Sequence, residues 1–62
     1  MKENKLVYRA HFETGEVLEW YAPQNSFKHV LKTFKTIIRD DKTHGVVERF
    51  DDNGKVIFRI EE

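Results

Sequence analysis

The side chains of this sequence that could carry out chemistry are three histidines, one serine and a few adjacent acids. His11, His29 and His44 form neither an i, i+4 pair nor a His-x-His pair, the spacings that bring two imidazoles to one metal ion. Ser26, the only serine, precedes a helical pattern, which predicts a helix cap rather than a nucleophile. The sequence therefore predicts no catalytic residue, no metal site and no cofactor, and we expect no enzyme activity.

The segment from residue 26 to residue 40 holds four basic side chains and no acid before Asp40. On a helical wheel these four lie within roughly 60 degrees of one another, away from the apolar residues of the same segment. Such a basic stripe is typical of a solvated helix back, and it also offers contacts to phosphate groups. The stripe consists of Lys28, Lys32, Lys35 and Arg39.

Composition sets limits on the class of protein. The 62 residues, of which 39% are hydrophobic, predict a single small folded domain spanning residues 1–62. Eleven basic and eleven acidic side chains balance, so no strong overall attraction to nucleic acid or to a membrane is expected. The chain lacks cysteine, which suits a reducing compartment, and it lacks an apolar run long enough to span a membrane. We expect a cytoplasmic protein without a membrane partner.

Residues 6–12 and 17–22 alternate between apolar and polar side chains, which predicts two strands of a hairpin. A two-residue Thr14–Gly15 turn would place Arg9 opposite Trp20. A three-residue loop with Gly15 in a left-handed conformation instead pairs Tyr8 with Trp20. We favour the three-residue loop because it gathers the large apolar side chains on one face. It also pairs Arg9 with Glu19 on the other face.

Residues 46–50 and 56–60 predict a second hairpin, whose register stays open. The sequence favours a three-residue loop, in which a type I turn starts at Asp51 with Gly54 fourth and Phe50 lies opposite Val56. That register groups Val46, Phe50, Val56, Phe58 and Ile60 on one face, with Glu48 among them, which suggests a strand near the sheet edge. A two-residue Asn53–Gly54 turn instead groups Val47, Val56, Phe58 and Ile60, with Arg49 among them.

Between the hairpins, apolar residues recur at helical spacing, and Asn25 or Ser26 can cap the helix. The apolar stripe consists of Phe27, Val30, Leu31, Phe34, Ile37 and Ile38. The predicted fold is α+β, ordered ββαββ, with a four-stranded mixed sheet and the helix packed on one face. The favoured strand order is 2-1-4-3, with the first and last strands parallel at the centre, although a different order stays open.

In element order and length, the chain resembles β-grasp proteins such as the immunoglobulin-binding domain of protein G. No binding motif accompanies this resemblance, so we infer no immunoglobulin binding from it. A single helix leaves the other sheet face uncovered, where aliphatic residues, a tyrosine and arginines have the composition of a protein interface. The residues expected on this face are Val7, Arg9, His11, Tyr21, Val47, Arg49, Ile57 and Arg59.

The function expected from these features is a small non-catalytic interaction module, such as an inhibitor, an adaptor or an accessory protein. Its partner is expected to be another protein, or a second copy of the chain, bound through the open sheet face or the basic helix. The alternative is a nucleic-acid-binding protein that uses the basic stripe for phosphate contacts.

Overall fold

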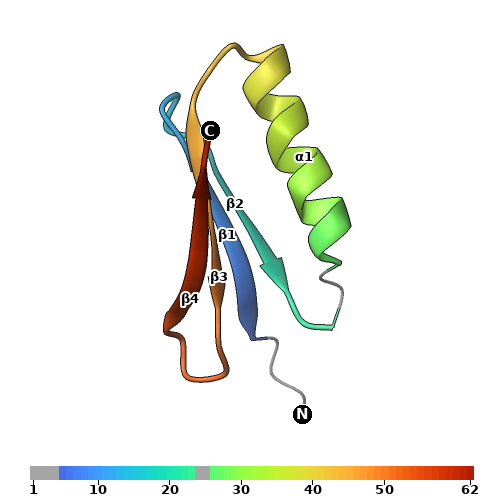
Figure 1. Ribbon diagram of the computed structural model, residues 1–62, viewed down its shortest axis with the longest axis vertical. Coiled ribbons are helices and arrows are strands. Elements are labelled where there is room, and N and C mark those ends of the chain that lie inside the picture. Colours follow the sequence, from blue (N-terminus) through green and yellow to red (C-terminus); the bar gives the residue numbers. More distant parts are fainter. Residues whose placement is uncertain (1–4, 24–25) are drawn as a thin grey trace.

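The computed structural model describes residues 5–23 and 26–62, which form two hairpins separated by a helix (Figure 1). The strands are β1 (Leu6–Phe12), β2 (Val17–Tyr21), β3 (Gly45–Phe50) and β4 (Val56–Glu61), and the helix is α1 (Phe27–Asp40). Within this described part of the chain, no helix is long and apolar enough to cross a membrane. The α+β class and the ββαββ order are confirmed.

The four strands form one sheet in the order β2-β1-β3-β4, and each neighbouring pair is antiparallel. The predicted order 2-1-4-3 and the parallel centre are therefore wrong, because β1 pairs with β3 rather than with β4. Burial explains the difference. Gly45 and Val47 of β3 are buried, whereas β4 is exposed along almost its whole length and suits an edge. The sheet is thus not that of a β-grasp protein.

The first hairpin has the predicted register. Tyr8 lies opposite Trp20 and Arg9 lies opposite Glu19. Gly15 has a φ of +96°, and its N–H donates to the carbonyl of Phe12 at 2.9 Å, as a three-residue loop requires. Nearer the start of β1 the register shifts between Leu6 and Tyr8, which leaves Val7 as the extra residue of a β-bulge.

The second hairpin combines the two predicted registers. The N–H of Gly54 donates to the carbonyl of Asp51 at 3.0 Å, and Phe50 lies opposite Val56, as the three-residue loop predicts. The register then shifts, so that Arg49 lies opposite Phe58 and Ile57 is the extra residue of a second bulge. Both predicted groupings are therefore wrong in part. One face carries Val47, Arg49, Phe58 and Ile60, and the other carries Val46, Glu48, Phe50 and Val56.

The helix packs on one side of the sheet (Figure 1). Its cap is Ser26, whose Oγ accepts a hydrogen bond from the backbone N–H of His29 at 3.5 Å, while Asn25 lies outside the described residues. Val30 and Phe34 are fully buried against the sheet, and the Phe34 ring lies 5.6 Å from that of Phe12. Among the described residues, no element covers the opposite side of the sheet.

Candidate functional site

The side of the sheet away from α1, the open face, carries a row of alternating charges across all four strands. Arg9 of β1 lies opposite Glu19 of β2 and also opposite Glu48 of β3, and Glu48 lies opposite Arg59 of β4. Cross-strand neighbours of opposite sign attract, so this charged row stabilises the sheet in its observed register. His11 joins the row from the next position along β1, with its Nε2 3.8 Å from Glu48 Oε1.

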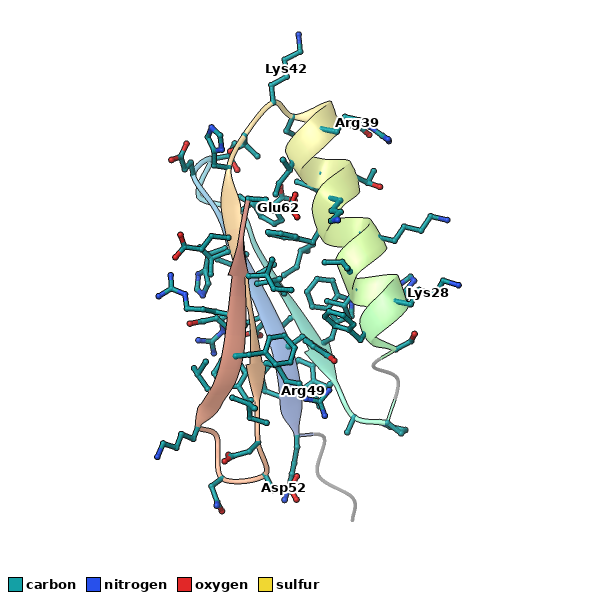
Figure 2. The ribbon with its side chains drawn as sticks, in the orientation of Figure 1. Lys28, Arg39, Lys42, Arg49, Asp52 and Glu62 are labelled. Carbon is teal, nitrogen blue, oxygen red and sulfur yellow. The ribbon has the colours of Figure 1, made fainter. Side chains whose placement is uncertain are left out.

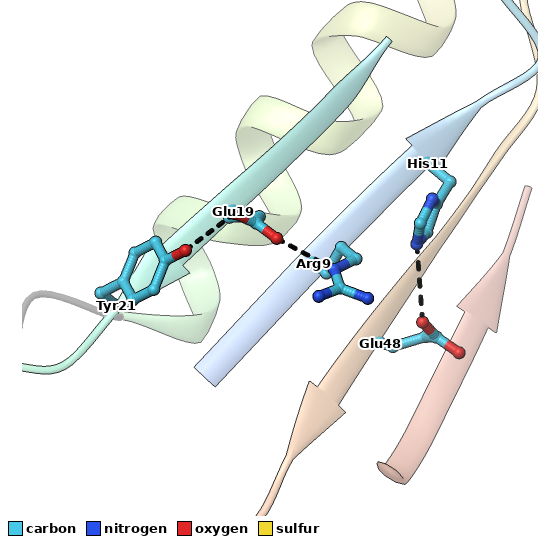
Figure 3. Close-up of polar contacts among 5 residues, drawn as sticks. All are labelled: Arg9, His11, Glu19, Tyr21 and Glu48. Carbon is cyan, nitrogen blue, oxygen red and sulfur yellow. Dashed lines mark hydrogen bonds and ion pairs between the residues drawn. The ribbon is translucent and has the colours of Figure 1, made fainter. Parts of the chain in front are cut away.

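Glu19 holds the most closely connected part of this row (Figure 3). Its carboxylate accepts a hydrogen bond from the Tyr21 hydroxyl at 2.8 Å and another from Arg9 Nε at 3.1 Å. The hydrogen bond from Tyr21, helped by the Arg9 guanidinium, holds the pKa of Glu19 below its ordinary value. The same hydrogen bond raises the pKa of Tyr21, because the carboxylate favours the protonated phenol. The Tyr21 hydroxyl is thus held in a fixed direction on the face.

A chain of contacts extends from Tyr21 to the far edge of the sheet. The Arg9 guanidinium, which is bound to Glu19, lies 5.4 Å from the centre of the Phe50 ring. Phe50 in turn lies opposite Val56 on β4. Tyr21 and Val56 are each about two-fifths exposed, and Phe50 is half-buried. We call Tyr21, Arg9, Phe50 and Val56 the open-face patch.

Four of the eight residues predicted on the open face lie there: Arg9, His11, Tyr21 and Arg59. Two others, Val7 and Val47, are buried, with exposed fractions of 9% and 1%, so they cannot contact a partner. Ile57 is 55% exposed, but it occupies the bulge of β4 rather than a regular strand position.

Arg49 lies on the helix side of the sheet instead. Its guanidinium lies 5.1 Å from the centre of the Tyr8 ring, and Nη1 donates a hydrogen bond to the Tyr8 hydroxyl at 2.6 Å. Tyr8 is only 1% exposed and stacks on Phe27 at the start of α1. Arg49 therefore satisfies the polar tip of a buried aromatic side chain, which is a structural role.

The basic stripe is exposed on the outer side of α1, where Lys28 and Arg39 point away from the sheet (Figure 2). Two of its four members are close to acids. Lys35 Nζ lies 3.6 Å from Glu62 Oε2, and Arg39 Nε donates to Asp40 at 3.2 Å. Among the described residues, Lys28 and Lys32 have no ion-pair partner. The stripe thus offers fewer free charges than the sequence indicates.

A shallow hollow of about 530 Å³ lies at the end of the sheet nearest the C-terminal end of α1. His11 and His44 line this hollow together with three glutamates. The spacing of the two histidines in the sequence does not indicate that they lie close together. Across residues 5–23 and 26–62, no group of three or more histidine, aspartate or glutamate side chains could hold a metal ion. The hollow is lined by His11, Phe12, Glu13, His44, Gly45, Val46, Glu61 and Glu62.

Sequence reasoning missed Phe50 and Val56, both of which it assigned to the helix side. The cause is the bulge at Ile57, which the sequence does not reveal. Without an extra residue in β4, Val56 would lie on the same face as Ile60, but with the bulge it lies on the opposite face. The sequence also overstated the burial of Phe27, which is 40% exposed and packs edge-on against Phe58 at 5.8 Å.

Comparisons of the chain with protein-family models, with curated proteins and with solved structures find no match in any of the three. The class is therefore defined by architecture alone: in the part of the chain that the structure describes, a small α+β fold has an antiparallel 2-1-3-4 sheet, one helix and an uncovered sheet face.

Proposed function

We propose that this protein is a small non-catalytic interaction module that binds another protein through the open-face patch. The observation that carries the proposal is the series of contacts from Tyr21 through Glu19 and Arg9 to Phe50. Phe50 in turn lies opposite Val56 on β4. Tyrosine and arginine are among the residues that most often dominate binding energy at interfaces. Here both are held in place by Glu19, so little side-chain entropy is lost when a partner binds.

The surrounding residues support a protein partner. The charged row, which shares Arg9 with the patch, alternates in sign and is paired within the sheet, so it forms a polar border rather than a field of one sign. An apolar centre with a polar border is the usual anatomy of a protein interface. The absence of cysteine suits action in the cytoplasm, which we include in the proposal.

The test compares variants in affinity capture from the native host, followed by direct binding measurements with the recovered partner. Tyr21→Ala and Val56→Lys change exposed positions of the patch, and each should weaken binding by about thirtyfold if it lies at the centre of the interface. The matched control is the double reversal Lys28→Glu/Lys32→Glu on the opposite side of the molecule, which should leave binding unchanged. Full binding by both patch variants would reject the proposal.

The same control tests the second candidate, nucleic-acid binding by the basic stripe. The observation in its favour is that Lys28 and Lys32 are exposed and, among the described residues, lack an acidic partner. If nucleic acid is the partner, the double reversal abolishes binding, and the affinity of the unchanged protein falls steeply with salt. Recovery of nucleic acid with this pattern would replace the protein-binding proposal.

A further inference from the structure

Strand β4 forms one edge of the sheet, and hydrogen bonding shows which of its backbone groups face outward. Just beyond its end, Glu62 exchanges two hydrogen bonds with Gly45, at 2.9 and 3.0 Å. In an antiparallel pair such bonded positions recur at every second residue, so Ile60 also directs its backbone groups toward β3. The N–H and C=O groups of Arg59 and Glu61 therefore point away from the sheet. They are available to another strand.

These two residues also carry side chains of opposite charge on the open face. Arg59 Nη2 lies 2.8 Å from Glu61 Oε2, and the two side chains are 55% and 65% exposed. The bulge at Ile57 disturbs the regular pattern nearer the turn. The regular, outward-facing part of the edge is thus short, and it contains one positive and one negative side chain.

We propose that two copies of the chain pair along β4, antiparallel, about a two-fold axis at Ile60. The charges select this register. Centring the axis on Arg59 or on Glu61 brings two like charges together, which is unfavourable in a cross-strand pair. Centring it on Ile60 places each Arg59 opposite Glu61 of the other copy. The outward N–H and C=O groups of both residues then form hydrogen bonds with the other copy.

The rest of β4 suits this arrangement. On the helix side, Phe58 is 39% exposed, so α1 leaves the apolar side chains of this strand partly uncovered. In the paired state, Ile60 lies opposite its own copy on that side and apolar contact is gained. The two-fold axis is perpendicular to the sheet, so both helices lie on one side and both open faces on the other.

Sedimentation velocity over a wide range of protein concentrations tests the proposal, with circular dichroism to confirm that each variant folds. The unchanged protein should form a dimer as the concentration rises. Arg59→Glu or Glu61→Arg alone should weaken the dimer by about tenfold or more, because each creates two like-charge pairs across the axis. The double variant Arg59→Glu/Glu61→Arg restores opposite charges and should dimerise like the unchanged protein.

Amide hydrogen exchange supplies a second readout that requires no substitution. The N–H groups of Arg59 and Glu61 should exchange more slowly as the protein concentration rises, whereas that of Ile60, already directed at β3, should not change. Glu61→Pro removes an outward N–H without removing a bond to β3, and it should abolish the dimer. Val17→Pro, at the first residue of the other edge strand, is its control and should leave the dimer intact.

The proposal would be overturned by a protein that is monomeric at every concentration or by a double charge variant that fails to restore association. Loss of association with Val17→Pro but not with Glu61→Pro would overturn it too. Assemblies that grow beyond the dimer would indicate pairing of β4 with β2 and would also overturn it. None of these substitutions changes a residue of the open-face patch. Arg59 belongs to the charged row beside the patch, but Glu61→Pro leaves that row unchanged as well, so its outcome separates dimer formation from the proposed function.

Discussion

Gly45, the buried first residue of β3, lies against Phe12 and Phe34 of the core, and replacing it with alanine should destabilise the protein. A Cβ at this position would lie 2.8 Å from the backbone oxygen of His11, 2.8 Å from Phe12 Cδ1 and 3.0 Å from Phe34 Cε1. Ordinary van der Waals contact begins at 3.4 Å. The Phe12 and Phe34 rings are packed together, and the His11 oxygen belongs to β1, so none of the three can withdraw freely.

The size of the effect follows from this crowding. Overpacking a filled core costs about 1–3 kcal/mol, and a protein of this length has a total free energy of unfolding of about 3–9 kcal/mol. Each kcal/mol lowers the melting temperature of so small a protein by about 4–8 °C. Gly45→Ala should therefore lower the melting temperature by about 10 °C, with a proportionate loss of urea resistance.

Urea and thermal unfolding, followed by circular dichroism and by the fluorescence of Trp20, measure this loss. The matched control is Gly15→Ala, where nothing lies within 4 Å of the added Cβ but the φ of +96° is unfavourable. That variant should lose about 1–2 kcal/mol through backbone strain alone, and it should leave the NMR signals of the Phe12 and Phe34 rings in place. If Gly45→Ala unfolds at the same temperature as the unchanged protein and leaves the ring signals unmoved, the reasoning is refuted.

Two further predictions concern polar contacts on the two faces of the sheet. In Tyr21→Phe, the pKa of Glu19, followed by NMR titration of its carboxyl carbon, should rise toward its ordinary value, because the largest cause of its depression is removed. A depressed pKa of Glu19 stabilises the folded state above the ordinary glutamate pKa, and this stabilisation is lost as the pH falls through the pKa of Glu19 in the folded protein. Tyr21→Phe should therefore lose less stability on acidification than the unchanged protein. An unchanged pKa of Glu19 in this variant would contradict the role of the Tyr21 hydrogen bond. Arg49→Met should cost about 1–3 kcal/mol by leaving the buried Tyr8 hydroxyl without its donor. The double variant Tyr8→Phe/Arg49→Met should cost less in urea unfolding than the two single changes added together, and strict additivity would show that the pair is not coupled.

Local sequence patterns predict much of this fold. Alternation locates all four strands, helical spacing locates α1, and Gly15 and Gly54 both lie at positive φ in the predicted three-residue loops. These features depend on residues close together in the chain, where backbone sterics and side-chain burial act directly.

The bulges could not be predicted in the same way. An extra residue such as Val7 or Ile57 is chemically identical to its regular neighbours, so no composition signal marks it, yet it reverses the face of the residues beyond it. In β3, Val46 and Val47 are equally apolar, and only the completed sheet decides which of them faces the helix.

The strand order depends on contacts across the whole chain and was beyond local patterns for that reason. For the residues of the candidate site, the face could be predicted only where the strand is regular. Arg9, Tyr21 and Arg59 belong to regular parts of their strands and were placed on the correct face, while Phe50 and Val56 lie beyond a bulge and were not.

The pairing of β1 with β3 has a consequence for how the molecule folds. Each hairpin joins residues that are close in sequence, but Tyr8 and Arg49 meet across a separation of 41 residues. In the described sheet, β1–β3 is the one pairing between strands that are not consecutive along the chain. Closing so long a loop costs entropy before any contact compensates for it, and folding slows as such distant contacts increase. We therefore expect the joining of two preformed hairpins along β1 and β3, with α1 docking across them, to set the folding rate.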